Sequence, residues 1–418
     1  METTLELARD ESIPASHALP STKTFAEFFA GIGLVRMGLE RLGWSVSFAN
    51  DIDPQKYQMY RSQFSDTDRH FLLDDIHSIS AQVVPDVLLA TACFPCNDLS
   101  LAGSRSGLYH GKQSSAFWGF IRILRDLGGR RPPLVLLENV TGFLTSNKGE
   151  DFKGALLALN DLGYAVDAFI LDAARFVPQS RQRLFVVGSQ ENCFKSPNVQ
   201  NRLLRPNDSR PEALTHFISS HPQIRWGIQH LPPQPGREFT LEDVLEDLPE
   251  TAPEWWNRER ATYLLSQMSS RHREIAERMI ANAEWSYGTV FRRVRNGKSM
   301  AELRTDGLAG CLRTPRGGSG RQILFKAGQE KYFARLLTPR ECARLMGASD
   351  YAISVPLNQS LFGFGDAVCV PVVEWIAKHY LNPLADILTS TYLFQNNCRE
   401  SVDYEGEGKG TGSLWSLV

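Results

Sequence analysis

Cys96 is the residue whose type and position most directly indicate chemistry. It follows Pro95 just after the apolar run Val87–Ala90. A turn at the carboxyl end of a parallel strand is where open α/β sheets bind ligands, which favours a thiol facing a cleft as a nucleophile. Two alternatives stay open: a buried structural thiol, and a zinc or redox pair with Cys93. The pair has no second set of ligands in the sequence and no thioredoxin-like context, so we expect no metal site.

Three further residues indicate partners for a nucleophile. Glu138 ends the apolar run Leu134–Leu137, and a carboxyl group held there against an apolar wall can stay protonated and deliver a proton. Arg181 and Arg183 are spaced by two, and guanidinium groups pointing into a cleft suit carbonyl or phosphate oxygens. The plainer alternatives are a surface or helix-capping acid for Glu138 and a solvated strand edge for the arginines.

A glycine turn and two acids indicate a cofactor site. Gly31 and Gly33 lie between the strand-like run Phe25–Phe29 and a helical segment, so backbone amides can approach a ligand closely. Asp51 lies roughly 20 residues on, at the end of the next predicted strand, where a ribose hydroxyl would be held. Asp75, after a third apolar run, suits an adenine amino group. A tight turn and solvated loop acids are the alternatives.

The elements that must position these residues alternate between strand and helix. This alternation predicts an α/β fold with a doubly wound, mostly parallel sheet. The predicted strands are Phe25–Phe29, the period-two run at Trp44, Val46 and Phe48, and then Val87–Ala90, Leu134–Leu137 and Leu184–Val187. Helical faces are predicted from Val35 to Leu42, from Phe117 to Leu127 and from Phe152 to Leu162.

The pattern changes after Gly188, where segments rich in Pro, Asn, Ser and Arg have no sustained period. An acidic cluster at 241–254 is followed by a strongly basic stretch from Arg292 to Arg340. Thr338, Pro339, Glu341 and Gly347 then predict a capped helix. The expected organisation is a disordered extension (1–22), a catalytic and cofactor-binding domain (23–190), a smaller irregular domain (191–335), a segment returning to the first domain (336–385) and a flexible tail (386–418).

Composition sets limits on the class of protein. With 418 residues and 42% hydrophobic content, the chain is long enough for two or more folding units. Seven scattered cysteines indicate a reducing compartment, and a net charge of -2 alone does not favour nucleic acid. The sequence shows no secretory signal and no apolar run of roughly 20 residues, so we expect a cytoplasmic protein without a membrane span.

Six motifs in order resemble the DNA (cytosine-5)-methyltransferases of bacterial restriction-modification systems. They cover residues 25–380: Phe29-Ala30-Gly31-Ile32-Gly33, Pro95-Cys96, Glu138-Asn139-Val140, Gln179-x-Arg181-x-Arg183, the segment RLLTPRECARLMG, and Gly365-Asp366-Ala367-Val368. The resemblance implies an S-adenosylmethionine-dependent methyltransferase fold, with a target recognition domain between Arg183 and Thr338. The chain departs from the family's usual residues at Leu34, Asn97 and Asp366.

The resemblance also implies roles. Cys96 would add to carbon 6 of a cytosine flipped out of duplex DNA, and Glu138 would protonate or hydrogen-bond ring nitrogen 3. Arg183 with Arg181 would hold O2 and the nearby backbone. S-adenosylmethionine would contact Phe29, Gly31, Gly33, Asp51, Ile52, Asp75, Pro95 and Asp366. Duplex DNA would contact Ser100, Arg313, Arg316, Arg321 and Gln322, all predicted as DNA-binding residues.

Three other functions fit the sequence less well than DNA methylation. Transfer RNA methylation by the same fold is disfavoured by the long segment 190–335, which is basic at its end. A silent DNA-binding homologue is expected to lack Cys96 or Glu138, and an oxidoreductase would need the full dinucleotide glycine spacing. We therefore expect a monomeric enzyme that protects host DNA beside a cognate endonuclease and associates with the nucleoid through DNA binding.

Overall fold

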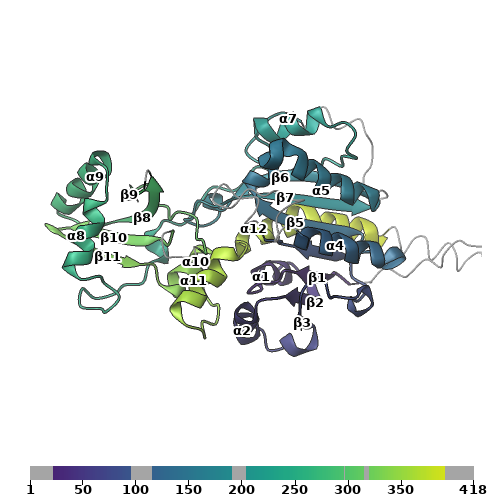
Figure 1. The fold of residues 1–418 in the computed structure, drawn as a ribbon, viewed down its shortest axis with the longest axis horizontal. Helices are drawn as coiled ribbons and strands as arrows, with labels where there is room; N and C mark the ends of the chain where they lie inside the picture. Colours follow the sequence, from purple (N-terminus) through teal and green to yellow (C-terminus); the bar gives the residue numbers. More distant parts are fainter. Residues whose placement is uncertain (1–21, 96–114, 191–203, 296, 315–319, 391–418) are drawn as a thin grey trace, which may run out of the picture.

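The computed structural model describes residues 22–95, 115–190, 204–295, 297–314 and 320–390. Within these ranges the protein has a large lobe and a small lobe, joined through the segments around α10 (Pro339–Leu345) and α11 (Leu357–Asp366) (Figure 1). Cys96, Ser100 and Arg316 lie outside the described residues, as does nearly all of the predicted extension 1–22. Helix continues to Ser390, into the segment 386–418 for which the sequence predicts a flexible tail.

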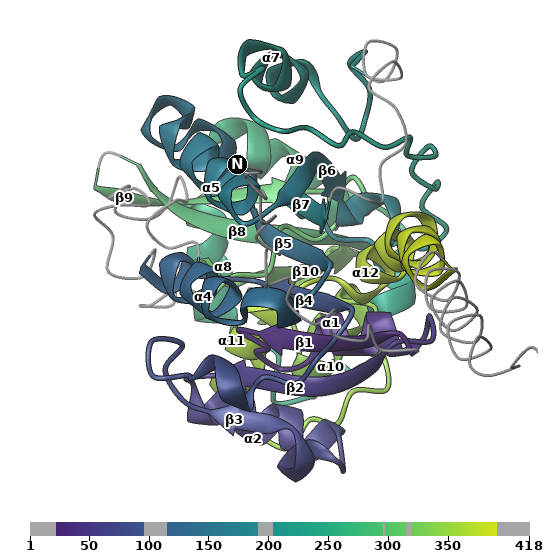
Figure 2. The ribbon, with the colours of Figure 1, turned by 90° about the vertical axis from the view of Figure 1, so that its right-hand side faces the viewer.

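The large lobe is built on a seven-stranded sheet in the order β3-β2-β1-β4-β5-β7-β6, which Figure 2 shows in succession. Pairing is parallel from β3 through β5 and antiparallel for β5 with β7 and for β7 with β6. This confirms the predicted doubly wound, mostly parallel sheet. The strands are β1 (Thr24–Phe28), β2 (Ser45–Asp51), β3 (Phe71–Leu73), β4 (Leu89–Ala92), β5 (Leu134–Val140), β6 (Tyr164–Asp172) and β7 (Gln182–Gln190).

Helices cover both faces of this sheet, and alternate residues of each strand point to each layer. Leu134 and Leu136 of β5 pack in the core that includes α1 and α12, whereas Val135 and Leu137 pack in the core that includes α4 and α5. The helices are α1 (Leu34–Glu40), α2 (Pro54–Gln63), α4 (Ser115–Asp126), α5 (Glu150–Asp161) and α12 (Val370–Ile376). Short 3-10 turns lie at Thr67–Arg69, Ala81–Val83, Gly128–Arg130, Thr141–Gly149, Ala173–Arg175 and Glu242–Val244.

The small lobe contains a four-stranded antiparallel sheet in the order β11-β10-β8-β9. Sequence analysis did not predict these strands, because charged residues such as those of SYGTVFRRVR interrupt the period-two pattern. Two helices pack on the sheet around Ala276 and Phe325. The elements are α8 (Arg258–Ser266), α9 (Ser270–Ala281), β8 (Ser286–Arg295), β9 (Lys298–Arg304), β10 (Ile323–Gly328) and β11 (Lys331–Leu336).

A buried charge network attaches the chain after β7 to the large lobe. Asp167 of β6 accepts two hydrogen bonds from Arg210 at 2.7 and 2.9 Å, one from the Gln229 amide at 2.9 Å and one from the Tyr380 hydroxyl at 3.0 Å. Asp167, Arg210 and Tyr380 are all buried. The segment around α7 (Glu212–Ser220) therefore contacts β6, although it falls within the range 191–335 of the predicted second domain.

Alanine in place of Asp167 should lower the free energy of unfolding by about 3–5 kcal/mol, because it leaves the Arg210 guanidinium buried without its partner. Denaturant unfolding monitored by circular dichroism measures the change. Alanine in place of Asp208, whose ion pair with Arg175 is exposed, is the matched control and should lower stability by less than about 1 kcal/mol. Equal losses in the two variants would show that the Asp167 network contributes no special stability.

The C-terminal segment packs against the large lobe, where α12 contacts α1. Helix α10 (Pro339–Leu345) begins with the predicted capping box: the Thr338 hydroxyl accepts from the Glu341 amide at 3.1 Å, and the Glu341 carboxylate accepts from the Thr338 amide at 2.8 Å. Helix α11 (Leu357–Asp366), α12 and a π-helical turn (Ala377–Leu381) follow. The helical stretch Leu357–Ser390 is long and apolar enough to cross a membrane by composition, but 72% of its apolar window is buried inside the protein.

Candidate active site

One cavity of about 400 Å³ lies at the carboxyl ends of β1, β2, β4 and β5. This is the edge where strand order reverses between β1 and β4, the usual ligand site of open α/β sheets. Of the residues predicted for catalysis or cofactor binding, those that line it are Phe29, Gly31, Asp51, Ile52, Pro95, Glu138, Arg181, Arg183 and Asp366. The cavity therefore gathers motifs that are far apart in the sequence.

The β1–α1 turn shapes one end of the cavity. The Gly31 amide donates to Asp51 Oδ2 at 2.8 Å, and the Asp53 amide donates to Asp51 Oδ1 at 2.9 Å, so Asp51 ties the turn to the end of β2. Burial raises the pKa of Asp51. Gly31 has a φ of 57°, which glycine adopts without strain. Each Asp51 carboxylate oxygen has a further lone pair that can accept a hydrogen bond from a hydroxyl group.

Ile52 and Phe29 supply apolar surface to the cavity that Asp51 lines. Ile52 is 63% exposed although it is large and apolar, and both residues line the cavity. An exposed apolar side chain on a cavity wall suits the face of an aromatic base. Two predicted cofactor residues do not line the cavity: Gly33 packs against Tyr60 and Phe64, and Asp75 accepts a hydrogen bond from the His77 amide at 2.9 Å.

The antiparallel register of β5 and β7 brings Glu138 and Arg183 together. Arg183 pairs with Val140, which lies on the same face of β5 as Glu138. The Arg183 Nε atom lies 2.9 Å from Glu138 Oε1, and both side chains are largely buried. Burial raises the pKa of Glu138, although Arg183 and Arg181 act to lower it. A carboxyl group with a raised pKa at a cavity wall is suited to general acid chemistry.

Arg181 lies at the same wall but holds main chain together. Its Nη1 donates to the Leu312 carbonyl at 3.0 Å, and its Nη2 donates to the carbonyls of Gly365 at 3.1 Å and Ala367 at 2.6 Å. The guanidinium is only 3% exposed. Arg181 therefore joins the end of α11 to the chain that enters the small lobe, and places both beside Arg183.

Asn139 and Cys311, for which the sequence predicts no role in the site, contact this machinery. Asn139 Nδ2 donates to the Phe94 carbonyl at 3.3 Å, which positions the backbone just before Pro95. The only feature of the sequence that indicates a role for Asn139 is its position next to Glu138. Cys311 Sγ lies 3.4 Å from Arg181 Nη1 and 3.8 Å from Arg183 Nη2. Although burial opposes it, the neighbouring arginines lower the pKa of the Cys311 thiol. No local pattern in the sequence marks Cys311.

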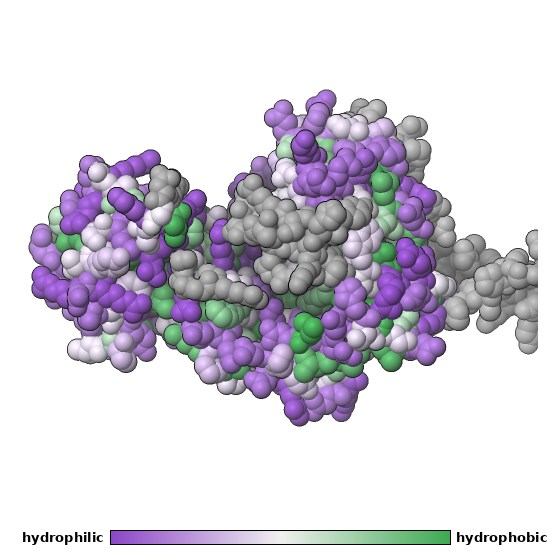
Figure 3. All heavy atoms as spheres, in the orientation of Figure 1, coloured by the Kyte–Doolittle hydropathy of each residue, from purple (hydrophilic) through white to green (hydrophobic). Residues whose placement is uncertain are grey.

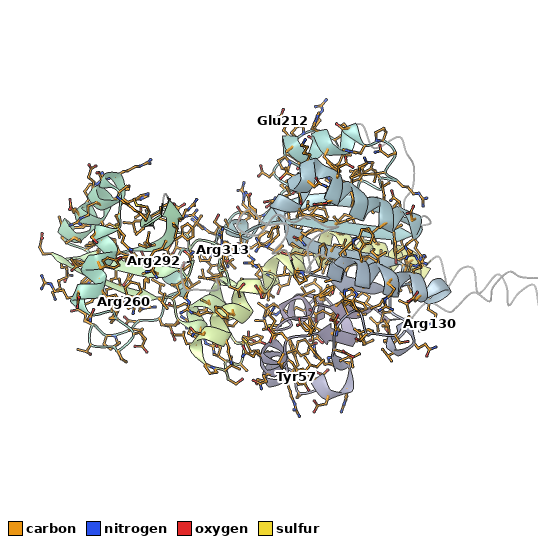
Figure 4. The ribbon with its side chains drawn as sticks, in the orientation of Figure 1. Tyr57, Arg130, Glu212, Arg260, Arg292 and Arg313 are labelled. Atoms are coloured by element: carbon orange, nitrogen blue, oxygen red, sulfur yellow. The ribbon has the colours of Figure 1, made fainter. Side chains whose placement is uncertain are left out.

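The predicted DNA-binding residues that the structure describes lie around the junction of the lobes. Arg313 is exposed, stacks over the Phe291 ring at 5.7 Å from its centroid, and lies between the lobes in Figure 4. Arg321 lies over the Phe362 ring at 5.9 Å. Gln322 is buried, and its side chain accepts from the Gly310 amide at 3.1 Å, so it is engaged within the protein.

Asp366 connects the cavity to the segment that carries Arg313. Its Oδ2 lies 2.7 Å from Lys56 Nζ, and its Oδ1 accepts a hydrogen bond from the Thr314 hydroxyl at 2.6 Å. Lys56, in the first turn of α2, also lines the cavity. Sequence analysis selected neither Lys56 nor Thr314, because nothing near them in the chain indicates this contact.

The sheet order, the helices on both faces and the cavity at the β1/β4 switch point define an S-adenosylmethionine-dependent methyltransferase fold. The structure of S. pombe Dnmt2 methyltransferase superposes with a TM-score of 0.57 at 18% identity, covering 87% of this chain and 99% of that one. A putative DNA modification methyltransferase from an E. coli prophage superposes with a TM-score of 0.52 at 17% identity, covering 87% of this chain and 100% of that one.

Residues 23–382 match the family described as C-5 cytosine-specific DNA methylase, and the chain belongs to that family. The type II methyltransferase M.DsaV of Dactylococcopsis salina is 28% identical over 360 residues, which are 86% of this chain and 86% of M.DsaV. The type II methyltransferase M.HhaI of Haemophilus parahaemolyticus is 26% identical, over 84% of this chain and 92% of that protein. The protein is thus a DNA (cytosine-5)-methyltransferase, as the motifs predict.

Proposed function

We propose that the enzyme methylates carbon 5 of a cytosine flipped out of a short duplex DNA sequence, through a covalent bond between Cys96 and carbon 6. The observation that carries this proposal is the buried Glu138–Arg183 pair, which lines the same cavity as Pro95, the residue before Cys96. An acid with a raised pKa beside a fixed guanidinium matches a ring that must be protonated at nitrogen 3 and held at O2.

The residues at the β1–α1 end fit S-adenosylmethionine. Asp51 has acceptor capacity for ribose hydroxyls, and Ile52 and Phe29 supply apolar wall for the adenine ring. Gly31 and Pro95 also line the cavity, and Asp366 lines it from the end of α11. When bound, S-adenosylmethionine supplies an electrophilic methyl group. Gly33 and Asp75, which do not line the cavity, would act by shaping the turn and the end of β3.

The chain's own residues then carry the ring chemistry. The Cys96 thiolate forms a bond to carbon 6 while Glu138 gives a proton to nitrogen 3, so negative charge does not build up on the ring. Arg183 holds O2, and Arg181 positions Arg183 through the Leu312 and Gly365 carbonyls. Carbon 5 would take the methyl group, which leaves the donor as a neutral thioether. A base then removes the carbon-5 proton, nitrogen 3 returns its proton to Glu138, and the thiolate leaves as the ring double bond reforms.

The arginines of the small lobe would hold the duplex. In Figure 4, Arg313 lies between the lobes and Arg292 lies on β8 of the small lobe. The visible face of the small lobe is mostly hydrophilic in Figure 3. The Arg260 guanidinium lies over the Trp256 ring. Burial lowers the pKa of Arg260, and the positive charge of Arg292 lowers it further. Such a concentration of positive charge suits phosphates. Arg316, Arg321 and Gln322 remain predictions for contacts with base edges, and Ser100 remains a predicted DNA-binding residue.

The biological role that best fits these relatives is protection of host DNA beside an endonuclease that acts on the same site. The enzyme would act in the cytoplasm, and it would act as a monomer, since residues of one chain suffice to line the cavity. Duplex DNA rather than transfer RNA is the proposed substrate, and competition between the two for methyl incorporation separates these alternatives.

Bisulfite sequencing of DNA from cells expressing the protein tests this function. Wild type should protect the cytosines of one short motif from conversion, and Cys96→Ala should protect none, because the nucleophile is missing. Cells carrying the empty vector supply the background. Identical conversion patterns for wild type and empty vector, with the protein present and folded, would refute the proposal.

A further inference from the structure

A charged pair spans the cavity that is proposed to hold the methyl donor. Lys56 lies on the α2 side, next to Asp51 and Asp53, and Asp366 lies on the α11 side, with 2.7 Å between Nζ and Oδ2. Burial acts to lower the pKa of Lys56, but Asp366 and Asp51 outweigh this and raise it, so the ammonium group stays charged. The contact is therefore a charge-assisted hydrogen bond that joins the two cavity walls.

The second oxygen of the Asp366 carboxylate contacts the chain segment that is proposed to meet DNA. Asp366 Oδ1 accepts from the Thr314 hydroxyl at 2.6 Å, and Thr314 directly follows Arg313, which is exposed toward the small lobe. One carboxylate group thus has one oxygen on the cofactor cavity and the other on the chain segment proposed to meet DNA.

The Asp366 carboxylate is 43% exposed, but the backbone of α11 that carries it packs closely against both sides. A Cβ atom at Gly365 would lie 2.7 Å from the Arg313 carbonyl carbon, so the end of α11 lies directly against that backbone. A Cβ atom at Gly363 would lie 2.7 Å from the Met59 sulfur of α2. Neither Gly363 nor Gly365 has room for a side chain against these neighbours. We therefore expect a displacement at α2 or at Arg313 to move the backbone that carries Asp366.

We infer that Asp366 couples the two ligands of the enzyme: by holding Lys56 with one oxygen and Thr314 with the other, it makes binding of the methyl donor and of duplex DNA strengthen each other. This inference rests on the proposed function. A donor that fills the cavity fixes the Lys56 side, and DNA that engages Arg313 fixes the Thr314 side. The ligand that binds second then meets a carboxylate that is already ordered, and the coupling is reciprocal.

The coupling can be measured as a ratio of dissociation constants. S-adenosylhomocysteine serves as the cofactor probe, and sheared genomic DNA from cells that lack the enzyme, at saturating concentration, serves as the DNA probe. Calorimetry gives the dissociation constant of the first with and without the second. For wild type we expect DNA to tighten S-adenosylhomocysteine binding at least about fivefold.

Thr314→Val removes the hydroxyl without changing the size of the side chain, so it should reduce this gain to about twofold or less. Its affinity for S-adenosylhomocysteine without DNA should stay close to that of wild type, since Thr314 does not line the cavity. Thr314→Ser keeps the hydroxyl and should restore the gain. Lys56→Met should also reduce the gain. The gain is the ratio of the S-adenosylhomocysteine dissociation constants without and with DNA, so it can be compared with wild type even if the affinity without DNA changes.

Several results would overturn the inference: no gain in wild type, a full gain in Thr314→Val, or a gain lost equally in Thr314→Ser. A Thr314→Val protein that binds S-adenosylhomocysteine weakly without DNA would also overturn it, since the contact would then only support the cavity. Failure of wild type to methylate DNA would refute the proposed function instead, and the binding ratio does not depend on that assay.

Discussion

Serine in place of Cys96 should slow methyl transfer by at least about a thousandfold and abolish the covalent complex with DNA that contains 5-fluorocytosine. The physical reason is that a serine hydroxyl is ionised far less than a thiol at neutral pH, so it adds poorly to carbon 6. In wild type, fluorine at carbon 5 cannot leave as a proton does. The ring double bond then cannot reform after methylation, and the enzyme stays attached to the DNA.

Denaturing electrophoresis measures this complex directly, in the presence and absence of S-adenosylmethionine. Cys93→Ser is the matched control, because Cys93 lies three positions away in the same Cys-x-x-Cys segment and lines the cavity. That variant should still form the complex if Cys96 is the nucleophile. A complex that survives in Cys96→Ser, or that disappears only in Cys93→Ser, would assign the chemistry to a different group.

Glutamine in place of Glu138 should reduce the rate of methyl transfer by about a hundredfold to ten-thousandfold, the usual effect of losing a positioned general acid. The amide can still donate a hydrogen bond to ring nitrogen 3, but it cannot transfer a proton. Because burial raises the pKa of Glu138, its protonated form persists above the usual pH range of a carboxylic acid. The wild-type rate should therefore fall as pH rises through that raised pKa, as the proton is lost.

The pH profile of single-turnover methyl transfer separates this chemical role from a structural one. In Glu138→Gln the decrease in the rate of methyl transfer with rising pH that is attributed to Glu138 should be absent, since an amide does not titrate. The rate should be low at every pH. Glu150→Gln, which changes an exposed acid of α5 paired with Lys153, should behave as wild type. A Glu138→Gln enzyme that keeps the wild-type rate and profile would contradict the proposed proton transfer.

Much of the large lobe and of the candidate site was predictable because its signals are local. The strands β1, β2, β4, β5 and β7 follow short apolar runs, and the capping box of α10 lies within four consecutive residues. Strand β6 was missed, since it is buried on both faces and alternates weakly. Cys96, Glu138 and the turn at Gly31 were selected from their positions after strands, a rule that holds for open α/β sheets in general.

The sequence by itself determined the family, the type of sheet and the candidate nucleophile and acid, because each depends on residues close together in the chain or on motif order. Only the tertiary structure decided which groups touch. The β5–β7 register placed Arg183 on Glu138, and α11 placed Asp366 between Lys56 and Thr314. Such contacts join residues remote in sequence, and their formation depends on how whole elements pack, which the nearby sequence does not encode.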